Sequence, residues 1–406
     1  MSPTRRQLLA GSAALAAARS LAAREIDVAP TGAAYELAPD VSYLNHASIG
    51  TVPSVVMAAH ERYLRTCETN PWLYIWGDEW DELAEGVHDS AAEYLGCSSA
   101  DVAVSRNTTA AFGLLANGLE FVDGERDEVL FSSLIHVGAS ASWEHAAPAR
   151  GYSVRRFEFP ERDASGLSED DVVRLHLDAI SERTAVLVLP HVDNVIGLRH
   201  PVARIAREAR SRGVAYVCVD AAQTVGMLDF NVAALGADLF ATSAHKWLQA
   251  PKGTGLMVLS ERLRAALRPL VVTWGQGSWK GTAREYTDFG TRALPALLSL
   301  GDAIAFQARS KGREAHHASL FALAQSLTEE QPRLHWRSPR RFEDGAALVA
   351  VGLEVGSARA EADRLFKEHG IVLRPFEGKG RNHLRISPNL LNTPGEIKTL
   401  FERLRV

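Results

Sequence analysis

Several stretches of this 406-residue chain are apolar along their whole length and alternate with segments that carry helix signals. Residues 184–189 and 214–219 show no polar alternation, so both faces of each run are expected to be buried. Pro201 at a helix start and Gly213 at a helix end place a helix between the two runs. This pattern predicts a mostly parallel α/β sheet with helices on both faces. Further strands are predicted at residues 101–105, 128–131, 152–159 and 256–259.

The pattern changes beyond about residue 294. Residues 295–326 and 359–369 read as long helical stretches, and residues 346–351 and 383–386 read as short strands between them. This predicts a smaller α+β domain packed against the large one. The predicted division is a signal peptide at 1–22, an N-terminal segment at 23–55 that joins the small domain, a large domain at 56–294 and a small C-terminal domain at 295–406.

The first 22 residues have the layout of a secretory signal. The pair Arg5-Arg6 precedes a short apolar run at 8–18, and Ser20-Leu21-Ala22 follows as a cleavage-like site. The sequence TRRQLL resembles a twin-arginine signal, so we expect export to the periplasm or beyond. The alternative is a basic start on an alanine-rich helix. Because the apolar run falls short of the ~20 residues that span a bilayer, no stable membrane insertion is expected after cleavage.

Charge and cysteine content exclude several functions. The formal net charge of −5 offers no basic stripe for nucleic acid. The three cysteines, Cys67, Cys97 and Cys218, match neither a metal site nor a disulfide framework. His316 and His317 are adjacent, and on a helix they would point in different directions, so we expect a surface face there. No metal site is therefore predicted.

The segment LFATSAHKW, residues 239–247, delivers Lys246 from a strand into a turn rich in hydroxyls. A half-buried lysine can have a lowered pKa, which suits an amine that forms a Schiff base. Asp220 ends the apolar strand YVCVD at 216–220, where α/β sheets bind ligands, although a helix N-cap is the simpler interpretation of an isolated aspartate. The polar turn SRNTTAA at 105–111 enters a helix and suits a phosphate, or it is an ordinary N-cap at Asn107 or Thr108.

Taken together, these motifs resemble the class V aminotransferases of fold type I, which include cysteine desulfurases, kynureninase and isopenicillin N epimerase. The resemblance runs from YLNHAS at 43–48 to the C-terminus and is strongest to the epimerase branch. It implies pyridoxal 5′-phosphate (PLP) as cofactor and a PLP-dependent transferase fold, with the large domain at 56–294 binding the cofactor. It also implies an enzyme that acts at the amino-bearing carbon of an amine or amino acid.

The resemblance implies a role for each matching residue. Lys246 would hold the cofactor covalently and act as base, Asp220 would pair with the ring nitrogen, and His136 would stack on the ring. Gln223 would lie near the ring hydroxyl and Asn194 beside cofactor and substrate. The phosphate contacts would come from Thr108, Thr109, Ser243 and His245.

Two further matches concern the substrate and the assembly. Arg385, in HLRIS at 383–387, matches the arginine that grips a substrate carboxylate, with Arg374 as a weaker second candidate. Thr291, in DFGT at 288–291, matches a turn that reaches the neighbouring subunit's phosphate site, which implies a homodimer with shared active sites. A surface arginine and a satisfied core histidine are the simpler alternatives for Arg385 and His136.

One departure from the family narrows the reaction. Desulfurases carry a nucleophilic cysteine before the carboxylate-binding arginine, but residues 374–382 contain none, so desulfuration through a persulfide is not expected. Glu377, Lys379 and Arg381 either read a polar substrate there or form a solvated loop. We expect an aminotransferase-type reaction, with an epimerase or a carbon-sulfur lyase as alternatives. A catalytically idle PLP-binding sensor is the alternative of another class. The identity of the substrate is left open.

Two other segments carry weaker signals. GQGSWKG at 275–281 looks like a dinucleotide fingerprint, but its last glycine is one position late, so an irregular loop is predicted. Trp72, Tyr74, Trp76 and Trp80 either cover the substrate entrance or belong to packing or a dimer interface.

Overall fold

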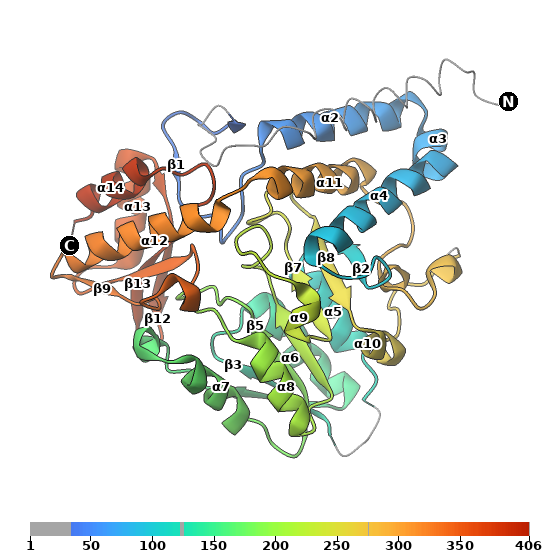
Figure 1. Cartoon of the computed structure of the whole chain (residues 1–406), viewed down its shortest axis with the longest axis horizontal. Helices are drawn as coiled ribbons and strands as arrows, with labels where there is room; N and C mark the ends of the chain where they lie inside the picture. The colour runs from blue at the N-terminus through green and yellow to red at the C-terminus, as the bar shows by residue number, and fades with distance from the viewer. Residues whose placement is uncertain (1–33, 122–125, 275, 406) are drawn as a thin grey trace.

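The computed structural model describes residues 34–121, 126–274 and 276–405, and a seven-stranded sheet lies at its centre (Figure 1). The strand order is β2-β8-β7-β6-β5-β3-β4, and β8 alone runs antiparallel to its neighbours in this sheet. The sheet is therefore mostly parallel, as the sequence predicts. Its strands are β2 (Val102–Ser105), β3 (Glu128–Ser132), β4 (Ser153–Phe157), β5 (Thr184–Pro190), β6 (Tyr216–Asp220), β7 (Leu239–Thr242) and β8 (Gly255–Leu259).

Helices cover both faces of this sheet, which explains the uninterrupted apolar strands. In β6, Val217 and Val219 join one buried cluster and Cys218 joins another, because alternate side chains leave a strand on opposite faces. The Cys218 face packs against α5 and α6, and the other face packs against α8. The helices that connect the strands are α5 (Thr108–Gly118), α6 (Val137–Arg150), α7 (Glu169–Asp178), α8 (Val202–Ser211), α9 (Val232–Leu235) and α10 (Glu261–Ala266).

A second, antiparallel sheet in the order β12-β13-β10-β9 lies with three helices on the left of Figure 1. The N-terminal strand β1 (Ser42–Tyr43) pairs in parallel with β11 (Ile371–Val372), so the N-terminal segment joins the C-terminal part of the chain here. The elements of this part are β9 (Leu334–Trp336), β10 (Val349–Leu353), β12 (Arg374–Gly378), β13 (Arg381–Ile386), α12 (Arg313–Glu329), α13 (Ala358–His369) and α14 (Pro394–Arg403).

Three N-terminal helices, α2 (Ser54–Thr69), α3 (Pro71–Trp76) and α4 (Asp78–Leu95), complete the large part of the molecule. They lie beside α11 (Leu294–Arg309), whose buried side chains join the same core cluster as α2 and α4 (Figure 1). The helical stretch predicted at 295–326 is thus two helices that separate at Gly312, where φ is +75°. The domain boundary at residue 294 stays a prediction.

Two smaller expectations from the sequence need correction. His317 does not lie on a surface face: it is fully buried beside the ring of Trp247, and burial lowers its pKa to about 3. The segment predicted as an irregular loop contains a 3₁₀ helix at Gln276–Trp279, although Gly275 lies outside the described residues. The signal at 1–22 also lies outside them. Within the described ranges, no helix is long and apolar enough to cross a membrane.

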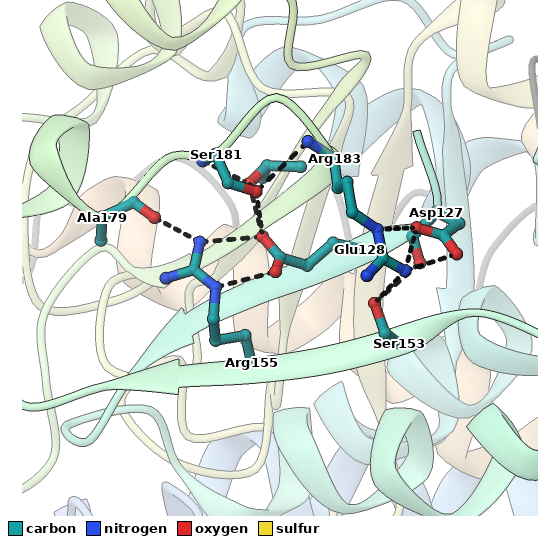
Figure 2. Close-up of polar contacts among 8 residues, drawn as sticks. Asp127, Glu128, Ser153, Arg155, Ala179, Ser181 and Arg183 are labelled. Carbon is teal, nitrogen blue, oxygen red and sulfur yellow. Dashed lines mark hydrogen bonds and ion pairs between the residues drawn. The ribbon is translucent and has the colours of Figure 1, made fainter. Parts of the chain in front are cut away.

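A buried carboxylate joins three strands of the large sheet at their amino ends (Figure 2). Glu128 on β3 accepts two hydrogen bonds from Arg155 on β4, at 2.7 and 2.8 Å, and others from Ser181 at 3.0 Å and Thr184 on β5 at 2.6 Å. Burial alone would raise the pKa of Glu128, but the hydrogen bonds from Arg155, Thr184 and Ser181 lower it below its ordinary value.

We predict that Glu128→Gln destabilises the protein by about 1–3 kcal/mol at neutral pH, because the charged acceptor is lost. Since folding lowers the pKa of Glu128, its contribution is present above the unfolded-state pKa and disappears as the pH falls through the folded-state pKa. Urea unfolding of variant and parent should therefore converge in acid. Asp127→Asn, at the more exposed pair with Arg183, is the control and should cost at most about 1 kcal/mol. Equal losses at every pH would contradict this account.

Candidate active site

The parallel strands bring the residues singled out in the sequence to one edge of the sheet. Strands β2, β3, β5, β6 and β7 share a direction, so the turns that follow them lie along the same carboxyl edge. This edge is where open α/β sheets bind ligands. The residues delivered to it are Thr108 after β2, His136 after β3, Asn194 after β5, Asp220 and Gln223 at the end of β6, and Ser243, His245 and Lys246 after β7.

Lys246 lies half-buried in the turn that follows β7. Burial lowers its pKa to about 8. The Asp220 carboxylate opposes this shift, and the Arg385 charge lowers the pKa slightly further. An appreciable fraction of the amine is thus neutral near physiological pH, which a Schiff-base lysine or a general base requires.

The backbone of Lys246 is held between the N-terminal segment and the loop after β6. The Gly50 amide donates to the His245 carbonyl at 2.7 Å, and a Cβ on Gly50 would lie 1.9 Å from the Lys246 carbonyl oxygen. On the other side Gly226, with φ at +89°, has room only for a hydrogen, since a Cβ there would lie 2.4 Å from the Leu248 amide. Only glycine allows this close approach at both positions.

Gln249 fixes the far end of the same turn. It is buried with φ at +60°, a left-handed conformation that costs a non-glycine residue about 1–3 kcal/mol and persists only where the surroundings hold it. Its side chain accepts from Tyr35 at 3.1 Å and from Gln307 on α11 at 3.1 Å, and it donates to Thr51 at 3.1 Å. The lysine turn is therefore tied to both the N-terminal segment and α11.

Asp220 and His136 lie close enough to Lys246 for their charges to interact. The Asp220 carboxylate is buried and accepts from the Ala222 amide at 3.0 Å in the turn after β6, where no helix begins, so Asp220 is not a helix N-cap. The His136 ring is exposed, so it is not a satisfied core histidine; partial burial lowers its pKa, and the nearby Asp220 opposes this. An open imidazole face beside a buried carboxylate suits a flat aromatic ring placed between them.

The start of α5 forms the anion-binding side of the site. Asn107 caps the helix by accepting from the Ala110 amide at 2.8 Å, as one of the sequence alternatives has it. The Thr108 amide and hydroxyl both contact the Ser243 hydroxyl, at 3.1 and 3.0 Å, so the turns after β2 and β7 meet here. Thr109 is exposed at the same helix start, where the helix dipole and hydroxyls favour a phosphate. The ring Nδ1 of His245 instead lies 3.1 Å from the Thr254 carbonyl.

Arg385 reaches this edge from β13 of the small sheet and is buried. Its guanidinium donates to the Asn194 backbone carbonyl at 2.9 Å, to Asn45 at 3.1 Å and to Ser48 at 2.7 Å. Within the described ranges it has no carboxylate partner, and its Nε has no hydrogen-bond partner. Burial lowers its pKa to about 9, and Arg374 adds to this effect. A buried guanidinium of this kind is prepared for an incoming carboxylate.

The loop that carries Asn194 is shaped by its neighbour Asp193. The buried Asp193 carboxylate accepts from the amides of Val195, Ile196 and Leu198, at 2.7, 2.9 and 2.7 Å. Burial raises its pKa to about 6. These bonds fix the loop conformation that presents the Asn194 carbonyl to Arg385.

Gln223 uses its amide inside the protein. It donates to the Ala47 carbonyl at 3.0 Å and accepts from the Trp247 indole at 2.6 Å, so it joins the N-terminal segment to the lysine turn. Thr291 lies exposed after Gly290, and its role in a neighbouring subunit's phosphate site stays a prediction.

Residues 374–382 form a strand and a hairpin turn, not an irregular loop. Glu377 accepts from Ser357 at 2.5 Å and from the Arg359 amide at 3.0 Å, and Arg381 pairs with Glu161 at 2.6 Å. Both charges therefore have partners within the protein, which speaks against a substrate role for them, and the paired hairpin corrects the alternative of a solvated loop.

Several residues of the site escaped prediction. Asn45 and Ser48 lie within a recognised motif, yet their hydrogen bonds to Arg385 follow only from the fold. Gln249 gives no local signal, because its strained φ and three side-chain bonds depend on segments far away in sequence. No group of three or more His, Cys, Asp or Glu side chains suited to a metal occurs in the part of the chain that the structure describes.

The donor set fits PLP. Lys246 offers an amine of lowered pKa to an aldehyde, Asp220 offers a carboxylate to a ring nitrogen, and the start of α5 with the Ser243 hydroxyl suits a phosphate. The free Arg385 Nε suits a carboxylate on the substrate. Such a combination defines the site of a PLP enzyme of fold type I.

The chain belongs to the class V aminotransferase family, whose profile, described as Aminotransferase class-V, matches residues 42–398. Isopenicillin N epimerase of Amycolatopsis lactamdurans is 30% identical over 399 residues, which cover 91% of this chain and 96% of that protein. A probable cysteine desulfurase of Streptomyces coelicolor is 26% identical over 391 residues, covering 89% and 91% of the two chains. The protein is thus a class V PLP-dependent enzyme.

Among solved structures, a variant of C-DES with glycine covalently linked to its PLP cofactor superposes with a TM-score of 0.82 at 20% identity. The superposition covers 92% of this chain and 98% of that one. It confirms the predicted fold type I, and family membership confirms the predicted cofactor, pyridoxal 5′-phosphate. The individual site roles stay predictions.

We predict that Gly50→Ala impairs cofactor loading, because its Cβ would push the Lys246 carbonyl out of place. After incubation with PLP and reduction with borohydride, peptide mass spectrometry should find less modified Lys246 than in the parent. Gly86→Ala is the matched control, since Gly86 is exposed on α4 and a Cβ there meets no atom within 4 Å. If Gly50→Ala loaded as completely and as fast as the parent, the close approach would not govern the position of the lysine.

Proposed function

We propose that the protein acts at the α-carbon of an amino acid or a peptide-like amine, with Lys246 as the base. The observation that carries the proposal is a half-buried amine whose pKa burial lowers to about 8, close enough to the Asp220 carboxylate and the Arg385 guanidinium for both charges to act on it. A base poised near neutral pH is effective in proton transfer.

PLP, when bound, supplies an electron sink for the charge left at the α-carbon. Lys246 would hold it through its aldehyde and then remove the α-proton, and Asp220 would keep a proton on its ring nitrogen. His136 would cover one face of the ring, with Asn194 and Gln223 at its edge. Arg385 would bind the substrate carboxylate. The phosphate would be held by Thr108, Thr109, Ser243, His245 and, from a second subunit, Thr291.

The fate of the proton separates the candidate reactions. The near full-length similarity to isopenicillin N epimerase supports its return to the α-carbon with inversion. Amino-group transfer, expected from the sequence, is the second candidate. It needs only one base, because Lys246 could remove the proton from the α-carbon and deliver it to the cofactor. The similarity to probable cysteine desulfurases gives little support to desulfuration here, since residues 374–382 contain no cysteine.

We expect the PLP-loaded protein to exchange the α-hydrogen of its substrate for deuterium in deuterium oxide. Deuterium uptake with inversion and no keto product supports the epimerase, and a keto product supports amino-group transfer. Lys246→Ala should slow exchange by roughly 10²- to 10⁴-fold, whereas Lys398→Ala, on the exposed face of α14, should not.

The exchange rate should rise as the pH approaches about 8 from below, because the neutral amine is the base. If the protein binds PLP but exchanges the α-hydrogen of no amine, the alternative of a non-catalytic PLP-binding sensor is favoured.

We further propose a homodimer with shared sites. Trp72 and Trp76 on α3 are 77% and 50% exposed, and the Trp76 ring stacks with Trp274, itself 81% exposed, at 6.2 Å. Val272 adds to this apolar patch, which a second copy of the chain would cover. The exposed Thr291 would then reach the other subunit's phosphate site.

We predict that the double variant Trp72→Arg, Trp274→Arg sediments as a monomer and holds PLP more weakly than the parent, which should sediment as a dimer. Phe366→Arg, at an exposed aromatic residue of α13, is the control and should leave both properties unchanged. A double variant that sediments like the parent would refute this interface.

Export by the twin-arginine route is also proposed, from Arg5-Arg6, the apolar run at 8–18 and the cleavage-like site at 20–22. That route carries folded proteins, so PLP would be loaded before export.

A further inference from the structure

Two arginines lie directly opposite each other at the rim of the site. In the antiparallel pair β12–β13, Arg374 is the register partner of Arg385. Directly opposed residues share one face of a sheet, with Cβ atoms about 4.5–5.5 Å apart, and like charges in that position repel. Keeping these two positive charges opposite each other therefore destabilises the folded protein.

Elsewhere in the molecule, paired arginines share a carboxylate. Arg210 and Arg262 both contact Asp238, at 2.8 and 2.7 Å. A second such pair meets at Asp288. Within the described residues, the two opposed arginines of β12 and β13 have no carboxylate between them, since Asp193, which acts on Arg385, uses its oxygens on three backbone amides. In the part of the chain that the structure describes, no carboxylate neutralises this pair.

The two guanidinium groups lie near the same aromatic ring but differ in burial. The guanidinium carbons of Arg374 and Arg385 lie 5.9 and 5.6 Å from the centre of the Phe376 ring, which stacks on His383 at 5.1 Å. Arg385 is buried and already donates to three partners, whereas Arg374 is exposed and forms no ion pair among the described residues. The two charges therefore suit two anionic groups, one at depth and one at the rim.

We propose that Arg374 binds a second anionic group of the substrate, beyond the carboxylate held by Arg385. The substrate class is then an α-amino acid or peptide-like amine whose side chain ends in a carboxylate. This rests on the proposed function, because it places the amino-bearing carbon near Lys246 and the α-carboxylate on Arg385.

The test is titration of the PLP-loaded protein, followed by the visible absorbance of the cofactor. The ligands are acid and amide pairs of increasing side-chain length: aspartate and asparagine, glutamate and glutamine, 2-aminoadipate and its side-chain amide. The parent should bind at least one acid roughly 1.5- to fivefold more tightly than its amide, the range expected for a partly exposed ion pair. Arg374→Gln should abolish that preference, and Arg374→Lys should keep part of it.

Arg403→Gln, which removes one exposed positive charge from α14, is the matched control and should retain the preference. Thermal unfolding of each variant checks that the fold is intact. Equal binding of every acid and its amide by the parent would overturn the proposal, as would an Arg374→Gln variant that weakens both members of a pair equally. A preference for sulfonate or phosphonate analogues over every carboxylate would overturn the carboxylate assignment. Failure of the proposed function is distinct: no ligand of any pair, and no other amine, would then change the absorbance.

Discussion

The site depends on how closely the N-terminal segment approaches the backbone of Lys246. A catalytic lysine must be partly withdrawn from water for its pKa to fall, yet its turn must remain open toward a ligand. Here the turn is covered from behind by Gly50 and Gly226, and Gln249 closes its end with hydrogen bonds to Tyr35, Thr51 and Gln307. The left-handed backbone conformation of Gln249 is strained, and these hydrogen bonds hold it in place.

The side of the site around Arg385 is built from three separate parts of the chain. Arg385 comes from the small sheet, Asn194 from the loop after β5, and Asn45 and Ser48 from the N-terminal segment. Because the Arg385 guanidinium donates to both other parts, its position depends on how the small and large parts are packed together. The ion pair between Arg381, at the start of β13, and Glu161 also joins the small part to the large part.

The architecture could be predicted well from the sequence, because strands that are apolar on both faces are buried only in a sheet covered on both sides. It also places Lys246, Asp220 and Thr108 correctly at one sheet edge, since parallel strands deliver their carboxyl ends together. It does not reveal what neighbours a side chain finds. His317 reads as a surface residue and is buried, and the hydrogen bonds of Gln223 to Ala47 and Trp247 follow only from the fold, while its place near the cofactor ring stays a prediction.

The pairing of β1 with β11 has a consequence for how the enzyme matures. The segment that supplies Gly50 is anchored to residues 371–372, and Asn45 is bridged to Ser387, so it cannot settle until nearly the whole chain has been synthesised. The turn that carries Lys246 receives its backing only then. We therefore expect this protein to acquire PLP late in its biogenesis, because an unfinished chain on the ribosome would present Lys246 without this backing.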